Sequence, residues 1–169
     1  RYLVDYVPPG SLVITISVSG GVSRTMEAAE WAKRQGCWVV GLTGRANSKL
    51  AQLAPETIVH YTVLSDDAQR LSTRGLANFE ASLLTLHLIA AQIGVGKGLL
   101  AVAEAAQLQQ ELRDMAAAMD QTVRANMEIT RAYAEQARES EAFFLVGAGP
   151  NYASALFGAA KLLEGPNLN

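Results

Sequence analysis

The sequence predicts an α/β fold in which three layers, α/β/α, are built around a parallel sheet. Three short apolar runs lack the polar alternation of half-exposed strands, so they predict strands that are buried on both faces. These runs are residues 12–17, 38–43 and 57–61. Helical periodicity occupies the stretches between and after them. The chain has 169 residues, of which 50% are hydrophobic and 18% charged, so it can bury a sizeable core.

The helices expected between these strands have recognisable ends. The first covers residues 26–35 and is closed by Gly36, because glycine adopts the left-handed C-cap conformation without a Cβ penalty. The second is short, residues 48–53, with Ser48 or Asn47 as its N-cap. Right-handed crossovers through these helices would place the three strands side by side.

The second half of the chain is mostly helical. Apolar residues recur at helical spacing over residues 76–96 and on one face of residues 108–119. Asp120 is the expected N-cap of a further helix. A strand, a turn of small residues and a last helix are then expected at residues 143–146, 147–152 and 153–164.

Composition excludes several classes of protein. A formal net charge of −2 and the lack of any Lys/Arg cluster argue against a nucleic-acid partner. A single cysteine, Cys37, excludes an internal disulfide framework, and the sequence shows no signal peptide or apolar run of membrane-spanning length. We therefore expect a cytoplasmic protein without a membrane partner. His60 ends the third strand and could face a ligand, but neither His60 nor His87 has a metal-ligating neighbour in sequence, so no metal or other cofactor is expected.

The turn after the first strand is the most informative motif. Between Ser17 and Thr25 it combines hydroxyl side chains with glycines, so backbone N–H groups can approach an anion closely while hydroxyls donate to it. A helix beginning near Val22 would direct the positive end of its dipole at the same point. The turn therefore predicts a phosphate site. The alternative is a plain strand-to-helix turn with a serine N-cap.

Ser17-Val18-Ser19-Gly20-Gly21 resembles the Ser-x-Ser-Gly phosphate loop of the sugar isomerase (SIS) family. The stretches at 41–43, 47–51 and 72–74 are similar to the strand, the short helix and the Ser-Thr-Lys segment that follow this loop in the family. A second match begins with Gly147-Ala148-Gly149-Pro150-Asn151 and continues through 159–164. It resembles the opening of the family's second domain, where a Gly-x-Gly turn precedes an Ala-rich helix that ends in Lys-x-x-Glu.

The resemblance implies flavodoxin-like domains in tandem. A first SIS domain without its first strand would cover residues 1–98, a helical connector 99–140, and the start of a second SIS domain 141–169, with both ends of the chain truncated. The ligand it implies is a sugar phosphate or an amino-sugar phosphate, bound by a homodimer without a cofactor. The amphipathic helices between residues 74 and 139 leave apolar faces for a second copy to cover.

The resemblance also assigns roles to individual residues. The phosphate-binding residues would be Ser17, Val18, Ser19, Gly20, Ser23 and Thr25. Further substrate-binding residues would be Ser72, Gly147, Gly149 and Asn151. The catalytic residues would be Glu164 and Lys161.

The expected chemistry is isomerisation, deamination or deglycation of a sugar or amino-sugar 6-phosphate through an enediol or enolamine. Glu164 would remove the proton beside the carbonyl and return it to the neighbouring carbon, while Lys161 stabilises the developing oxyanion. Read without the resemblance, the same two residues form an ordinary exposed i, i+3 pair. Val22 and Phe157 replace a Thr and an acidic residue of the family pattern, which keeps a non-catalytic phosphosugar sensor open as the alternative function.

Overall fold

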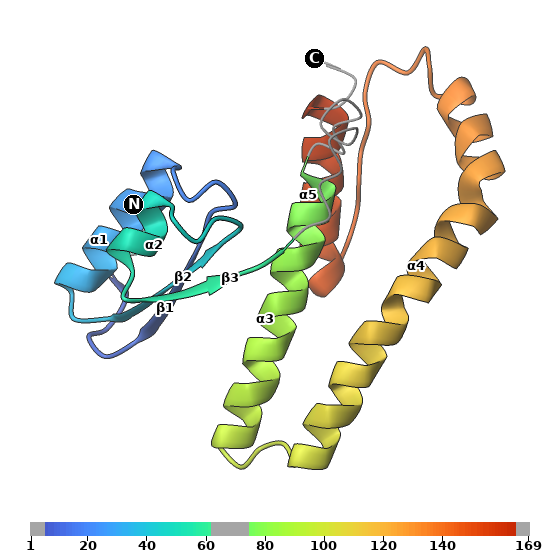
Figure 1. Cartoon of the computed structure of the whole chain (residues 1–169). Coiled ribbons are helices and arrows are strands. Elements are labelled where there is room, and N and C mark those ends of the chain that lie inside the picture. Colours follow the sequence, from blue (N-terminus) through green and yellow to red (C-terminus); the bar gives the residue numbers. More distant parts are fainter. Residues whose placement is uncertain (1–5, 62–74, 165–169) are drawn as a thin grey trace. The chain divides into compact units, whose positions relative to one another are not determined.

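The computed structural model describes residues 6–61 and 75–164, without the side chain of Glu164 (Figure 1). The chain divides into two compact units, Arg1–Gly96 and Lys97–Asn169. The first unit holds a parallel sheet, and the second holds two long helices. Each unit is described by itself below.

The sheet of the first unit confirms the parallel α/β prediction. Its strands are β1 (Leu12–Ile16), β2 (Trp38–Thr43) and β3 (Glu56–Val59), in the order β1-β2-β3. Pairing is parallel throughout, with Val13 opposite Val39 and Gly41 opposite Thr57. The expected strands at 12–17 and 38–43 are confirmed to within one residue, whereas β3 begins and ends earlier than its apolar run.

Two helices cover one face of this sheet (Figure 1). They are α1 (Ser23–Arg34) and α2 (Lys49–Leu53). The core between them and the sheet is built from small and medium side chains that are almost fully buried: Ala29, Ala32, Val39, Leu50 and Ala54. Alanines let α1 approach the strands closely, so the carboxyl ends of the strands and the start of α1 are held in a fixed relation. Gly36, at φ 75°, follows the end of α1 as expected.

Helix α3 (Leu76–Gly96) closes the first unit and lies beside β3. An apolar groove of about 440 Å³ runs along it, lined by Ile58, Thr85, Leu88, Ile89, Gln92 and Ile93. The sequence led us to expect no segment of membrane-spanning length, but by length and composition alone α3 is apolar enough to cross a membrane, with a mean hydropathy of 1.3 over its most apolar window. Only 11% of that window is buried within the described chain, so the helix leaves an apolar surface uncovered.

The second unit corrects two expectations. Helix α4 (Val102–Gln136) is continuous through Asp120, so no new helix starts there. The Asp120 carboxylate instead accepts a hydrogen bond from Arg124 Nε at 2.8 Å, one turn later, and an i, i+4 pair of this kind supports an uninterrupted helix.

No strand is described at residues 143–146, where the apolar run predicts one. A strand needs a hydrogen-bonded neighbour, and the described part of this unit offers only helices. The segment packs on helix α5 (Pro150–Glu164) instead, where Leu145 lies against Gly158. Helix α5 starts three residues before the expected 153, since Pro150 occupies its first position, where the missing N–H costs no helical hydrogen bond.

Candidate functional site

The candidate site is formed by two loops at the carboxyl edge of the sheet. Residues 17–22 connect β1 to α1, and residues 44–48 connect β2 to α2. The carbonyl of Val18 accepts hydrogen bonds from Gly44 N (3.0 Å) and from Thr43 Oγ1 (3.2 Å), which joins the two loops. The carboxyl edge of a parallel sheet is where α/β proteins bind ligands.

Gly20 lies where the first loop comes closest to the start of α2. It is buried, its φ is 61°, and its carbonyl accepts a hydrogen bond from Leu50 N at 2.9 Å. A Cβ at this position would overlap the side chain of Ser48. Ser48 is itself fixed there, because its Oγ caps α2 by accepting from Ala51 N at 3.3 Å. The close approach of the loop to α2 therefore requires glycine at this position.

The N-terminus of α1 is left without a side-chain cap. Its N-cap is Val22, in extended conformation, so the alternative of a serine N-cap is wrong. The first intrahelical bond runs from Met26 N to Val22 O, and the preceding N–H groups of Ser23, Arg24 and Thr25 have no acceptor inside the helix. The first turn holds no acidic side chain. The positive end of the helix dipole is therefore open to an anion.

The hydroxyls of the loop differ in their surroundings. Ser17 is 5% exposed, and its Oγ is buried without a hydrogen-bond partner among the described residues. Ser19 is exposed, and its Oγ accepts from Gly21 N at 3.3 Å. Ser23 is exposed and Thr25 half-buried in the first turn of α1. A buried hydroxyl without a partner is unusual and calls for an explanation, such as a ligand that completes its hydrogen bonding.

His60 follows β3 at the same edge, where it could have faced a ligand. The structure buries it, with 6% exposed, and its contact with a ligand stays a prediction. Its backbone N–H donates to Thr43 O at 3.0 Å, and its Nε2 lies 3.5 Å from Ser82 Oγ on α3. Burial lowers the pKa of His60 below its ordinary value of 6.5. The sequence did not reveal this link to Ser82, because residues 22 positions apart meet only through the tertiary fold.

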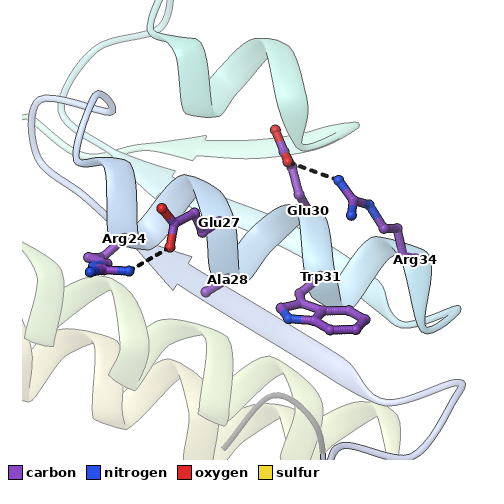
Figure 2. A pocket seen from close by; sticks show the side chains of 6 residues that line it. All are labelled: Arg24, Glu27, Ala28, Glu30, Trp31 and Arg34. Atoms are coloured by element: carbon purple, nitrogen blue, oxygen red, sulfur yellow. Dashed lines mark hydrogen bonds and ion pairs between the residues drawn. The ribbon is translucent and has the colours of Figure 1, made fainter. Parts of the chain in front are cut away.

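A hollow of about 340 Å³ lies on the outer side of α1 (Figure 2). Its charges are already matched, since Arg24 pairs with Glu27 at 2.9 Å and Arg34 with Glu30 at 3.3 Å. Trp31 and Ala28 complete its described lining. Because its arginines are already paired with glutamates, we expect this hollow to attract a phosphate less strongly than the loop after β1, where the helix N–H groups lack acceptors.

The predicted residues of the second unit lie around the start and the end of α5. Gly149 (φ 56°) precedes α5, and Asn151 is the second residue of the helix, where its N–H donates to Ala148 O at 3.2 Å. A Cβ on Gly147 would overlap the backbone of Asn151. In the last turn Lys161 Nζ lies 5.0 Å from the centre of the Phe157 ring, within cation–π range.

All the predicted site roles stay predictions, and three of the residues need a separate remark. Glu164 is the last residue of α5, and its side chain lies outside the described residues, as does Ser72. Val18 is partly exposed, and its carbonyl already accepts a hydrogen bond from Thr43 Oγ1. Among residues 6–61 and 75–163, no group of three His, Cys, Asp or Glu side chains is arranged to hold a metal ion.

Comparison with known proteins gives the same fold. The model of the SIS domain matches residues 2–93, which span the sheet and most of α3. Isomerizing glutamine–fructose-6-phosphate aminotransferases are similar over nearly the whole chain: that of Caldanaerobacter subterraneus subsp. tengcongensis is 29% identical over 97% of this chain, and that of Neisseria meningitidis serogroup A is 32% identical over 97%. This chain spans 26% of the length of each of these relatives.

A solved structure is also similar in fold. It is a Bacillus subtilis protein provisionally described as a phosphosugar isomerase, with a TM-score of 0.62 and 22% sequence identity over 89% of this chain and 43% of that one. Identity at this level shows a common fold. The single family match covers the first unit, and a second domain of the same kind from residue 141 stays a prediction.

Proposed function

This chain belongs to the SIS domain family, and from that premise we propose that it binds a sugar phosphate or an amino-sugar phosphate at the loop from Ser17 to Thr25. One observation carries the proposal. The buried Ser17 hydroxyl lacks a partner among the described residues, and the loop that Ser17 opens leads into a helix N-terminus that has neither a side-chain cap nor an acidic residue. A phosphate would satisfy both, because its oxygens accept hydrogen bonds and its charge complements the helix dipole.

Each part of the loop has a task in such binding. The N–H groups of Ser23, Arg24 and Thr25 donate to the phosphate oxygens, and the nearby hydroxyls of Ser17 and Ser19 donate as well. Gly20 and its contact with Ser48 keep the loop close to α2, which fixes the donors before the ligand arrives. Binding then costs little conformational entropy.

For the reaction we propose an aldose–ketose isomerisation, a deamination or a deglycation of a sugar or amino-sugar 6-phosphate. The names of the curated relatives, which include isomerisation and fructose 6-phosphate, support this class. Glu164 acts as the base: its carboxylate takes the proton from the carbon beside the carbonyl and returns it to the former carbonyl carbon through the planar intermediate. In the deamination or deglycation this proton shift gives an imine, and water then adds to its carbon and breaks the carbon–nitrogen bond, so that the amine leaves and the carbonyl oxygen comes from water. Lys161, in the last turn of α5, stabilises the negative charge that develops on the oxygen.

A phosphosugar sensor without turnover is the second candidate. Val22 occupies the N-cap of α1, where the family pattern has a phosphate-binding Thr, and its side chain cannot donate a hydrogen bond. Phe157 replaces an acidic residue of that pattern, and Lys161 lies against its ring. Both observations favour binding over proton transfer.

We also propose a homodimer as the working form in the cytoplasm. Leu83, Leu84 and Ile93 on α3 are between 37% and 43% exposed, and they belong to a helix whose most apolar window has a mean hydropathy of 1.3. A second copy would cover this surface, as well as the exposed methionines of α4. Sedimentation that shows only a monomer of 18.0 kDa at micromolar concentration would contradict the dimer.

Calorimetry with glucose and glucose 6-phosphate tests the binding site. We expect the phosphorylated sugar to bind at least about tenfold more tightly, because charge-assisted hydrogen bonds are the stronger ones. Ser17→Ala should weaken glucose 6-phosphate binding while Ser11→Ala, at the other end of β1, leaves it unchanged. Equal affinity for the two sugars, or equal effects of the two variants, would contradict the proposed site.

A further inference from the structure

Two basic residues follow β2 at the edge that carries the phosphate loop. Arg45 and Lys49 are both exposed. The backbone around Arg45 is fixed by two hydrogen bonds, from Arg45 N to Thr43 Oγ1 and from Ser48 N to Arg45 O, both at 3.2 Å. The peptide after Lys49 donates to Gly20 O at 2.9 Å through Leu50 N. Arg45 and Lys49 are therefore sequence neighbours of residues whose backbone N–H groups bond to the proposed phosphate loop, residues 17–25.

The charges of Arg45 and Lys49 are not neutralised within the described residues. Neither side chain makes an ion pair or a hydrogen bond there, and residues 17–25 and 44–50 contain no Asp or Glu. The basic residues of α1 are different. Arg24 and Arg34 pair with carboxylates, and Lys33 Nζ donates to Leu53 O at 3.3 Å. Of the basic side chains described in the sheet unit, the two without an ion pair or a hydrogen bond are Arg45 and Lys49, both on the connection next to the loop.

We propose that Arg45 and Lys49 bind a second anionic group of the ligand, so that the preferred ligand is a sugar phosphate that also carries a carboxylate or a second phosphate. This inference rests on the proposed function. Hydroxyls and helix N–H groups already serve the first phosphate, which leaves these two cations for another group. The Arg guanidinium offers a planar fork that fits a carboxylate or a phosphate, and the Lys ammonium adds a mobile point charge on a long stem.

Calorimetry with four probes tests the proposal. Glucose 6-phosphate carries one anionic group, 6-phosphogluconate adds a carboxylate, glucose 1,6-bisphosphate adds a second phosphate, and gluconate lacks the phosphate. The chain should bind at least one of the two doubly anionic probes about tenfold more tightly than glucose 6-phosphate. The probe that binds more tightly identifies the second anionic group as a carboxylate or a phosphate. Gluconate should bind weakly, because it cannot occupy the loop.

Two double variants locate the effect. Arg45→Gln/Lys49→Gln should reduce the preference for the doubly anionic probe to less than about twofold and keep the affinity for glucose 6-phosphate within about threefold. Lys33→Gln/Arg34→Gln removes the same charge from the far end of α1 and should keep the tenfold preference. A preference that falls equally in both variants reflects net charge alone and overturns the proposal.

Two further outcomes separate this inference from the proposed function. Glucose 6-phosphate could bind more tightly than glucose while neither doubly anionic probe binds more tightly than glucose 6-phosphate. That result would support the phosphate site and overturn the proposed role of Arg45 and Lys49. If no phosphorylated probe binds better than its unphosphorylated counterpart, the proposed function fails and this inference fails with it. Circular dichroism of each variant shows whether it is folded.

Discussion

The Nε2 atom of His60 lies 3.5 Å from the Oγ atom of Ser82, which links the end of β3 to α3. Ser82 donates its own hydroxyl proton to Asn78 O at 2.9 Å, so its oxygen is left to accept from His60 Nε2–H. The other ring nitrogen, Nδ1, is buried without a partner among the described residues. The neutral ring therefore suits this site, and a second proton on it would be buried without an acceptor.

The first prediction is a loss of stability in mild acid. Burial lowers the folded-state pKa of His60, so the unfolded chain binds the proton more readily. Above the ordinary pKa of 6.5 His60 is neutral in both states and does not lower the free energy of unfolding. As the pH falls from 6.5 through the lower folded-state pKa, the unfolded chain takes up the proton first, and the free energy of unfolding decreases. Urea unfolding at pH 7.5 and pH 5.5 measures this loss.

Variants assign that loss to one of the two histidines of the chain. His60→Gln keeps an N–H donor near the position of Nε2 but does not titrate, so its unfolding midpoint should change less between the two pH values. His87→Gln, on the exposed side of α3, should behave like the parent. If His87→Gln removes the pH dependence and His60→Gln does not, the role of His60 is contradicted.

The second prediction concerns Ser82. Ser82→Ala removes the acceptor and leaves His60 Nε2–H buried and unpaired, which should cost about 1–3 kcal/mol in the free energy of unfolding. Thr85→Ala on the same helix is the control, because among the residues that the structure describes Thr85 Oγ1 donates to Ala81 O within its own helix and to no other element. That change should cost less than about 1 kcal/mol. If both variants lose the same free energy of unfolding, the contact between His60 and Ser82 does not contribute to stability.

The third prediction concerns Gly20. Gly20→Ala forces a Cβ into the space of Ser48 at a φ of 61°, so we expect a loss of at least about 2 kcal/mol in stability together with weaker phosphate binding. Gly21→Ala is the neighbouring control, since its nearest contact would be Ser19 Oγ at 3.9 Å. Gly98→Ala, at a φ of 68° in open space, measures the backbone strain alone. If Gly20→Ala costs no more than Gly98→Ala, the packing against Ser48 is unimportant.

The fourth prediction concerns the proposed base. Glu164→Gln keeps the size of the side chain but removes its basic oxygen, so binding of a hexose 6-phosphate should survive while turnover falls about 10²-fold or more. Turnover and solvent deuterium exchange at C1 or C2 should be measured in the full-length protein with a panel of hexose and hexosamine 6-phosphates. A variant that exchanges as fast as the parent would exclude Glu164 as the base and favour the sensor.

Local patterns in the sequence determined much of the sheet unit. Strand β2 runs over the expected residues, Ser48 caps α2, and Gly36 follows α1 at positive φ, because apolar runs, caps and left-handed glycines depend on neighbours along the chain. The loop from Ser17 to Thr25 was likewise recognisable, since its hydroxyls and glycines lie close together in sequence. Its family resemblance is confirmed by the match over residues 2–93.

The tertiary structure decided what depends on distant residues. Whether residues 143–146 form a strand depends on a pairing neighbour, and the burial of His60 depends on α3. Only the fold shows that the Ser17 hydroxyl is buried without a partner among the described residues, and that Gly20 meets Ser48 across two loops. Sequence patterns encode short-range propensity, whereas burial and pairing are set by segments that meet only after the chain has folded.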